Sequence, residues 1–556
     1  MNRMAPVPVL LLIAAALDAN AGRAQTGVPE IRVDSVFADI DGPTTPGCAL
    51  SVMREGAIVY ERGYGMANLE YGIPITPQSV FHVASVSKHF TAMAVELLVN
   101  EGKVSWDDDI RKYVPEVPEF GTPITLRHLV HHVSGIRDQW NLLATAGWRW
   151  EADVVTQGDV LDITSRQTAL NFQPGERYLY SNTGFTLLAV VVERVTGRTL
   201  REFTTERIFR PLGMEATHFH DDHEMIVRNR AWAYAPERGG LFGLKNSIPD
   251  FDVVGATSLF TTVHDLAAWD RNFYSGRVGG RNALDRLHQR FVLNSGDTIG
   301  YAHGLGLGSY RSLRTVSHGG ADAGYRSQFL RFPDQRFAVA VLCNFPAADP
   351  GGRAFRVAEA YLGSVMGPRP ASDEPVVSQT VSMSRAELES LAGIYIGELP
   401  NQVLRVRLEG DTLRLGTGTG ARLRPIGGRQ FEVVGERSVV TIRPAEGGEP
   451  GTLSMPGQAR YRRMDAWQPS PTELGAFAGL YRSDELGTEY RLEVNGGQLV
   501  ARHRKLESRS LTPTFRDAFL LGGASAVFTR DANGGIAGFR VSDGRVWNVK
   551  FERAGG

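Results

Sequence analysis

The sequence has almost no net charge, because 60 lysine and arginine residues offset 61 aspartate and glutamate residues along 556 positions. Proteins that bind nucleic acid need a basic surface to displace counterions from phosphates. Anionic membranes attract basic segments in a similar way. The balanced charge therefore argues against nucleic acid or an anionic membrane surface as a partner.

Cysteine is scarce, with Cys48 and Cys343 alone. Each lies in an apolar run that predicts a strand, a setting in which free thiols are commonly buried. A disulfide requires the two Cα atoms to lie within about 7 Å of each other, which the sequence does not define. We expect buried free thiols and keep a disulfide between them as the alternative.

Long apolar runs are also missing. The run from Val7 to Leu17 is too short to cross a bilayer, which takes about 20 residues. Arg3 precedes it, and small residues with plausible cleavage points after Ala21 or Ala24 follow it. This pattern is typical of a signal peptide, here over 1–24. No later run predicts a membrane span, so we expect an exported, soluble protein that is periplasmic or secreted.

The region 28–366 mixes helix and strand patterns. Strand patterns occur near both of its ends, at 48–53 and 57–60 around a Glu55-Gly56 turn, and at 325–332 and 337–342 around a Pro333-Asp334 turn. A helical pattern runs between them from about 86 to 100. We expect an α+β domain in which the two ends form one antiparallel sheet flanked by helices.

A linker rich in proline and charge is predicted over 367–384, and an internal repeat follows it. The apolar pattern of 388–395 recurs 86 positions later at 474–481. Each copy continues into alternating strand patterns with glycine turns. We expect two small antiparallel β-barrel domains, 385–464 and 473–556, because closure hides the edges of a sheet.

The segment Ser85-Val-Ser-Lys88 carries the first chemical signal. A serine hydroxyl becomes a good nucleophile only when a base removes its proton. Three residues of helix place Lys88 on the same face as Ser85, and burial would make its neutral form accessible. Alone, such a short motif is more often a solvated serine and lysine.

Two further segments supply partners. In Tyr180-Ser-Asn182, the tyrosine could shuttle a proton and the carboxamide of Asn182 could hold a substrate amide, although a buried tyrosine is a common structural element. In His318-Gly-Gly320, the glycines would let a substrate lie against a strand. The backbone N–H of Ala321 could then join that of Ser85 in an oxyanion hole, although His-Gly-Gly alone is more often a turn.

Other chemistries find little support. A polar segment contains possible metal ligands, namely His218, His220, Asp221, Asp222, His223 and Glu224. Their spacing fits no helical zinc motif, so we expect no metal and no cofactor. The Gly-x-Ser-x-Gly motif of α/β-hydrolases is absent.

The three motifs occur in an order that resembles the serine β-lactamase and penicillin-binding protein family, at its class C, DD-peptidase and esterase end. Supporting segments of the same kind are Ile124–Gly135, Phe172–Gly175, Pro211–Met214 and Thr262–Trp269. The two β domains, with Tyr481-Arg-Ser-Asp-Glu-Leu486, are similar to the three-domain D-aminopeptidase branch. In that branch a loop of the last domain is implied to reach the active site.

The resemblance implies that Ser85 becomes acylated while Lys88 and Tyr180 move protons. It also implies that Asn182 and the strand at His318 align the substrate, and that water then releases the acyl group. Relatives that bind a carboxylate usually carry a hydroxyl residue where this chain has Gly319. Without that hydroxyl, and with a neutral His318, a free carboxylate should bind poorly.

We therefore expect a D-aminopeptidase-like peptidase or amidase that acts on a small molecule or short peptide. A carboxylesterase or a class C-type β-lactamase is the alternative within the family. A ligand sensor that is acylated but not turned over is the non-enzymatic alternative.

Overall fold

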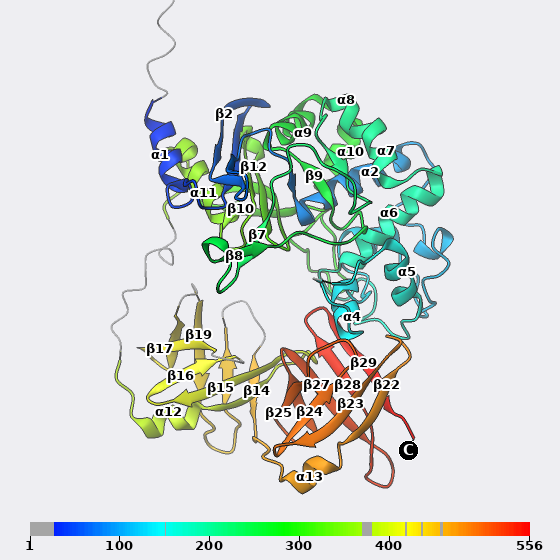
Figure 1. Ribbon diagram of the computed structural model, residues 1–556, viewed down its shortest axis with the longest axis vertical. Helices are drawn as coiled ribbons and strands as arrows, with labels where there is room; N and C mark the ends of the chain where they lie inside the picture. Colours follow the sequence, from blue (N-terminus) through cyan, green and yellow to red (C-terminus); the bar gives the residue numbers. More distant parts are fainter. Residues whose placement is uncertain are drawn as a thin grey trace, which may run out of the picture.

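Figure 1 shows the computed structural model of the chain, which describes residues 27–150, 152–369, 381–416, 420–434, 438–455 and 460–555. The expected signal peptide 1–24 and the central part of the expected linker, 370–380, lie outside the described residues. A part with a mixed sheet-and-helix structure occupies one end of the molecule, and two β-barrels lie side by side at the other. The expected α+β fold followed by two barrels is confirmed.

Six of the described strands form an antiparallel sheet in the order β10-β11-β12-β13-β1-β2. Their bounds are β1 Cys48–Arg54, β2 Ala57–Tyr64, β10 Gly306–Tyr310, β11 Leu313–Asp322, β12 Tyr325–Phe332 and β13 Phe337–Cys343. Because β1 pairs with β13, strands from the two ends of this region meet at the middle of the sheet, as expected.

The side chains of β1 and β13 are buried on both faces of the sheet. Helices pack against each face and so cover these apolar side chains. Leu50 and Val52 pack toward helices α1 and α11 on one face. Ala49 and Met53 pack on the other face into the large core that contains helices α2, α6 and α9. The helices are α1 Gly27–Phe37, α2 Lys88–Asn100, α3 Leu126–Val130, α4 Gln139–Thr145, α5 Gln157–Ser165, α6 Asn182–Thr196, α7 Leu200–Thr204, α8 Arg210–Leu212, α9 Val263–Ser275, α10 Gly280–Arg286 and α11 Pro350–Leu362.

Short strands connect these layers. They are β3 Met66–Asn68, β4 Ile73–Pro74, β5 Phe81–His82, β6 His218–Phe219, β7 Tyr234–Pro236, β8 Leu244–Asn246 and β9 Leu259–Thr261. None of the helices in the described ranges is long and apolar enough to cross a membrane.

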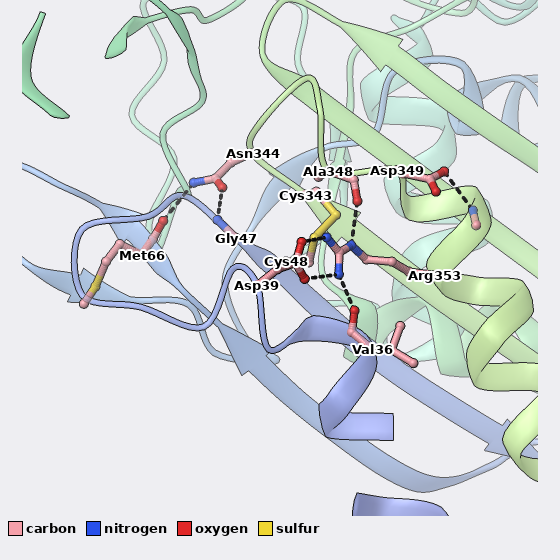
Figure 2. The surroundings of a disulfide bond; sticks show 11 residues. Val36, Asp39, Gly47, Cys48, Met66, Cys343, Asn344, Ala348, Asp349 and Arg353 are labelled. Carbon is pink, nitrogen blue, oxygen red and sulfur yellow. Dashed lines mark hydrogen bonds and ion pairs between the residues drawn. A yellow bond between two sulfur atoms is a disulfide. The ribbon is translucent and has the colours of Figure 1, made fainter. Parts of the chain in front are cut away.

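The two cysteines are joined in a disulfide, so the expectation of free thiols is wrong. Cys48 begins β1 and lies opposite Cys343 at the end of β13, in direct register. Their separation of 295 residues along the chain hides this proximity from the sequence. Figure 2 shows the neighbouring Arg353, whose guanidinium binds Asp39 in two places (2.7 and 2.8 Å) and so ties α11 to the segment after α1.

The first barrel follows helix α12 Arg385–Leu391. Its strands are β14 Gly393–Ile396, β15 Val403–Glu409, β16 Thr412–Leu415, β17 Ala421–Gly427, β18 Gln430–Val433, β19 Ser438–Arg443, β20 Thr452–Ser454 and β21 Tyr461–Met464. The second barrel follows helix α13 Pro471–Gly475. Its strands are β22 Gly479–Ser483, β23 Thr488–Asn495, β24 Gln498–Arg502, β25 Arg509–Pro513, β26 Ala518–Leu521, β27 Ala524–Arg530, β28 Ile536–Asp543 and β29 Val546–Arg553.

The internal repeat corresponds to one contact made twice. In each barrel a short helix precedes the first strand, and a buried tyrosine of that strand donates a hydrogen bond to a carbonyl four residues earlier, at or just after the end of the helix. Tyr395 donates to the carbonyl of Leu391 (2.7 Å), and Tyr481 donates to the carbonyl of Phe477 (2.8 Å). The repeated apolar pattern therefore marks how each barrel begins.

Candidate active site

Ser85 lies in the 3-10 turn η1 Ala84–Ser87, directly before α2, so the helix begins two residues later than the pattern predicts. Ala84 adopts a left-handed backbone conformation with φ 48°. Ser87 is buried, and its hydroxyl donates to the carbonyl of Ala84 (2.5 Å) and accepts from the N–H of Leu259 (2.9 Å). Of the two serines, Ser85 is the one that lines a pocket.

Lys88 lies fully buried one turn beyond Ser85. Its Nζ is 3.2 Å from Ser85 Oγ, and it donates to Asn182 Oδ1 (2.8 Å) and to the carbonyl of Ala256 (2.6 Å). A neutral amine has two N–H groups, and these two acceptors use both. Its lone pair is then left for the hydroxyl proton of Ser85, which is the arrangement a general base needs.

Burial also favours this neutral form. It lowers the pKa of Lys88 well below its ordinary value, because the charged amine loses its hydration. The carboxylate of Asp138 opposes this by raising the pKa of Lys88, while the guanidinium of Arg545 lowers it further. The dominant effect is desolvation, so burial favours the uncharged form of Lys88.

The ring of Tyr180 lies near the amine of Lys88 and the guanidinium of Arg545. Lys88 Nζ is 4.8 Å from its centroid and the guanidinium carbon of Arg545 is 5.5 Å away. Burial raises the pKa of Tyr180, and the side chain of Ser85 opposes this by lowering it. A protonated hydroxyl beside Ser85 can donate a proton to a leaving group.

Asn182 contacts both Lys88 and Asp138. It begins α6, and its backbone N–H and Nδ2 both donate to Asp138 Oδ2, at 2.7 and 2.9 Å. Its Oδ1 accepts from Lys88. Asn182 therefore orients Lys88 from the wall of the pocket. Its second Nδ2–H remains for a substrate, and the expected contact with a substrate amide stays a prediction.

His318 is nearly buried on β11, and both of its ring nitrogens are engaged. Because the carbonyl of Gly319 can only accept, Nδ1 donates to it (2.6 Å), and the hydroxyl of Tyr301 donates to Nε2 (2.9 Å). Burial lowers the pKa of His318 to about 4, and Lys88 acts in the same direction. The imidazole is therefore neutral, as expected, and offers no free donor to a substrate carboxylate.

The glycine at 320 is required by the packing of the fold. A Cβ atom on Gly320 would lie 2.2 Å from the carbonyl of Val83 and 2.3 Å from Ser327 Oγ. Its absence allows β11 to lie close to the segment that carries Ser85. Gly320 and His318 do not line the pocket, whereas the next residue, Ala321, does.

The pocket beside Ser85 has a volume of about 450 Å³. Its wall combines aromatic, acidic and basic side chains. The aromatic residues are Trp140, Trp150, Tyr180 and Phe251, the acidic residues are Asp153, Asp250 and Asp322, and the basic residues are Arg326 and Arg545. Of the carboxylates, Asp153 is paired with Arg149 at 2.9 Å, while Asp322 accepts from the hydroxyl of Thr257 at 3.0 Å.

The second barrel reaches this pocket through the turn between β28 and β29. Arg545 of that turn lines the pocket and lies 3.4 Å from Asp138 Oδ1. Its carbonyl accepts from Asn171 Nδ2 (2.9 Å), and the N–H of Trp547 donates to Asn171 Oδ1 (2.8 Å). The expected loop of the last barrel at the active site is therefore present.

A buried ion pair holds this turn in place. Arg137 Nη1 donates to Glu485 Oε2 at 2.6 Å, and the side chains of both residues are less than a tenth exposed. Arg137 Nη2 also donates to the carbonyl of Trp547 (2.8 Å). Arg137 thus ties the catalytic part to two places in the second barrel, the segment after β22 and the start of β29 just beyond the turn.

Sequence reasoning missed Asp138 and Arg545. Asp138 carries a local signal, because it caps α4 by accepting from the N–H of Trp140. That signal predicts a helix start and says nothing of Lys88. Arg545 has no local signal, since only the docking of the second barrel brings it to the pocket.

The polar segment 218–224 is divided between two surroundings. His218 Nε2 lies 3.4 Å from His220 Nδ1, and burial lowers the pKa of His220 to about 3. Asp222 and His223 instead group with Asp252, whose carboxylate is 2.9 Å from His223 Nδ1. The possible ligands in this segment are therefore not gathered around one point.

Comparison with known proteins places the chain in a family. The Beta-lactamase family model matches residues 33–362. The D-aminopeptidase of Brucella anthropi is 26% identical over 523 residues, which cover 91% of this chain and 95% of that protein.

Solved structures show the same fold. A penicillin-binding protein homologue from Pyrococcus abyssi, 20% identical, matches with a TM-score of 0.55 over 87% of this chain and 100% of that chain. The D-amino acid amidase of Ochrobactrum anthropi SV3, 23% identical, matches with a TM-score of 0.52 over 60% of this chain and 99% of that chain. Since the family model spans more than half of the residues, including all three motifs around Ser85, Tyr180 and His318, the chain belongs to the beta-lactamase family of serine hydrolases.

Proposed function

We propose that this protein is a serine peptidase or amidase that releases N-terminal D-residues through an acyl-enzyme on Ser85. Ser85 Oγ attacks the carbonyl carbon, and Lys88 accepts the hydroxyl proton. The N–H groups of Ser85 and Ala321 stabilise the oxyanion. Tyr180 passes a proton to the departing amine as the C–N bond breaks, and water then hydrolyses the ester on Ser85.

The contact that carries this proposal is the one between Ser85 Oγ and the buried amine of Lys88, at 3.2 Å. The two acceptors on Lys88 and its lowered pKa support the role of base. Ser87 is an unsuitable nucleophile, because its hydroxyl is committed to backbone groups.

The charges in the pocket support a substrate with a free amine. Asp250 and Asp322 line the pocket near Ser85 and can pair with an ammonium group. The two guanidinium groups are already engaged, Arg545 by Asp138 and Arg326 by the carbonyls of Ala323 and Tyr325. The neutral His318 adds no cation for a carboxylate. The D configuration is supported by the D-aminopeptidase relatives, which match most of the chain.

A substrate panel tests the proposal. We expect D-alanine nitroanilide to be turned over with a higher kcat/KM than its L isomer, and N-acetylation of the D substrate to abolish the preference. Asp322→Asn should raise KM for the free amine by about ten- to a hundredfold, the worth of one charge-assisted hydrogen bond, without changing KM for a neutral ester. Asp334→Asn, in an exposed pair with Arg314, is the matched control. Rapid hydrolysis of benzylpenicillin without turnover of D-alanine nitroanilide would contradict the proposal.

We also propose that the protein is exported after removal of residues 1–24. The Cys48–Cys343 disulfide supports this, because such bonds persist mainly in oxidising compartments. Sequencing the N-terminus of protein recovered from the periplasm and medium tests it. Cytoplasmic protein that retains its first residues would contradict it.

A further inference from the structure

The interior of the second barrel is filled unevenly. One half holds an aromatic cluster in which Phe477, Phe519 and Phe528 meet edge to face, with ring centroids 4.9–5.5 Å apart. The half toward α4 carries Ala501, Ala524 and Ala526 at positions that line the interior. An eight-stranded barrel is just wide enough either to be filled by side chains or to hold one small ligand.

The alanines leave a cavity of about 330 Å³ at this end. Its wall is mainly apolar. The buried barrel residues around it include Leu492, Leu511, Phe539, Val541 and Phe551. The cavity is open to solvent on one side, and its volume is near the lower end of the roughly 300–1,000 Å³ of ligand pockets. Ligand pockets are lined mainly by apolar side chains, as this one is.

The catalytic part covers one side of the end of the barrel. In Figure 1, α4 lies directly beside the strands of the second barrel. The hydroxyl of Tyr490 donates to the carbonyl of Thr145 (3.1 Å), which fixes α4 on the rim. The segment after α4 contributes Trp148 and Trp150 to the cavity wall. Trp150 also lines the pocket of Ser85, so the two cavities share a side chain.

Charged side chains at the open end of this cavity, its rim, determine which part of a ligand enters. Arg149 and Lys505 are both paired with Asp153, at 2.9 and 3.5 Å. The rim also carries Glu507 and Arg509, of opposite charge and both exposed. A charged head group would thus remain at the solvated rim, and the apolar interior would receive the chain.

We propose that this end of the second barrel binds a medium-length alkyl chain, separately from the pocket of Ser85. The occupant is a small aliphatic amphiphile, since the volume excludes a large lipid. Bound there, it packs against Trp150 on the side away from the catalytic residues. The site is independent of which bond Ser85 cleaves.

Calorimetric titration of the full-length protein with decanol tests this proposal. Ala526→Leu should fill the cavity and weaken binding by about tenfold or more, because each displaced methylene group is worth about fourfold in affinity. Val527→Leu is the matched control, since Val527 is the next residue of β27 and is exposed. It should leave the affinity within about twofold.

Thermal unfolding distinguishes cavity filling from misfolding. Because a leucine would occupy an empty space, the Tm of Ala526→Leu should match or exceed that of the wild type. Ala524→Leu, nearer the rim, provides a second filling variant. A Tm that falls in both filling variants would show that the space is not there and would overturn the proposal.

A final arm separates the two cavities. Decanol should still bind after Ser85 has been blocked with a small phosphonate. Binding that survives Ala526→Leu but is lost on phosphonylation would place the alkyl chain in the pocket of Ser85, and would overturn the proposal. No binding of decanol by the wild type would overturn it as well.

Discussion

The buried ion pair between Arg137 and Glu485 offers a direct test of how the second barrel is attached. Glu485→Gln keeps the size of the side chain but removes its charge, and so leaves a buried guanidinium without a counterion. Removing one partner of a buried pair costs about 3–5 kcal/mol. We expect the docked turn that carries Arg545 to open more often by a corresponding amount.

The amide of Trp547 reports this opening, because it donates across the interface to Asn171 Oδ1. Hydrogen exchange of this amide should accelerate by roughly 10²–10⁴-fold in Glu485→Gln. The control is Glu489→Gln in the same barrel. Glu489 is 3.4 Å from Arg482 in a pair in which both side chains are at least half exposed. An exposed pair is worth at most about 1 kcal/mol, so exchange should change by less than about fivefold.

Activity should follow the same order. Glu485→Gln should alter kcat/KM for amide substrates more than it alters labelling of Ser85 by a small phosphonate, since the phosphonate does not need the wall that Arg545 completes. Equal exchange rates in the two glutamine variants would refute the reasoning, because the buried pair would then stabilise the docked barrel no more than the exposed pair does.

Three further predictions follow from single contacts. Arg545→Gln should raise the pKa of Lys88, because the guanidinium of Arg545 lowers that pKa. More Lys88 is then protonated at a given pH, so the acidic limb of the kcat/KM profile should move to higher pH. Arg545→Lys, which keeps the positive charge, should leave the acidic limb near its original position. Gly319→Thr should improve turnover of carboxylate-bearing substrates, because it adds a hydroxyl that can donate to a carboxylate. The strand has room for it, since the new Cβ would be crowded only by the mobile end of Gln328, at 3.0 Å, and would lie 3.6 Å from the carbonyl of Ser327. An unchanged substrate profile in folded protein would contradict this. Cys343→Ser should lower the free energy of unfolding by about 5 kcal/mol, since the disulfide spans 295 residues. Denaturant titration with and without a reductant measures this free energy. If the reductant changed the stability of wild type and variant equally, the prediction would be contradicted.

Local patterns predicted much of the fold. The spacing of Ser85 and Lys88 follows from one helical turn, and the apolar alternation of β1 and β13 predicts a buried sheet. The repeated pattern around Tyr395 and Tyr481 predicts two similar barrels, because each tyrosine makes the same local hydrogen bond.

Contacts between distant segments could not be predicted in this way. The register that joins Cys48 to Cys343 depends on the pairing of β1 with β13. The arrival of Arg545 beside Tyr180 depends on how the second barrel docks. Asn182 was identified by its motif, but its partner Asp138 was not, so its contact with Lys88 was not foreseen.

The covalent intermediate on Ser85 tests the central claim most directly. Mass spectrometry of protein quenched with acid during turnover of a D-alanyl ester should show one added acyl group, located by peptide mapping on Ser85. Ser85→Ala should carry no adduct and should lose turnover by roughly 10⁴–10⁶-fold. An adduct on any other residue, or substantial turnover by folded Ser85→Ala protein, would contradict the account.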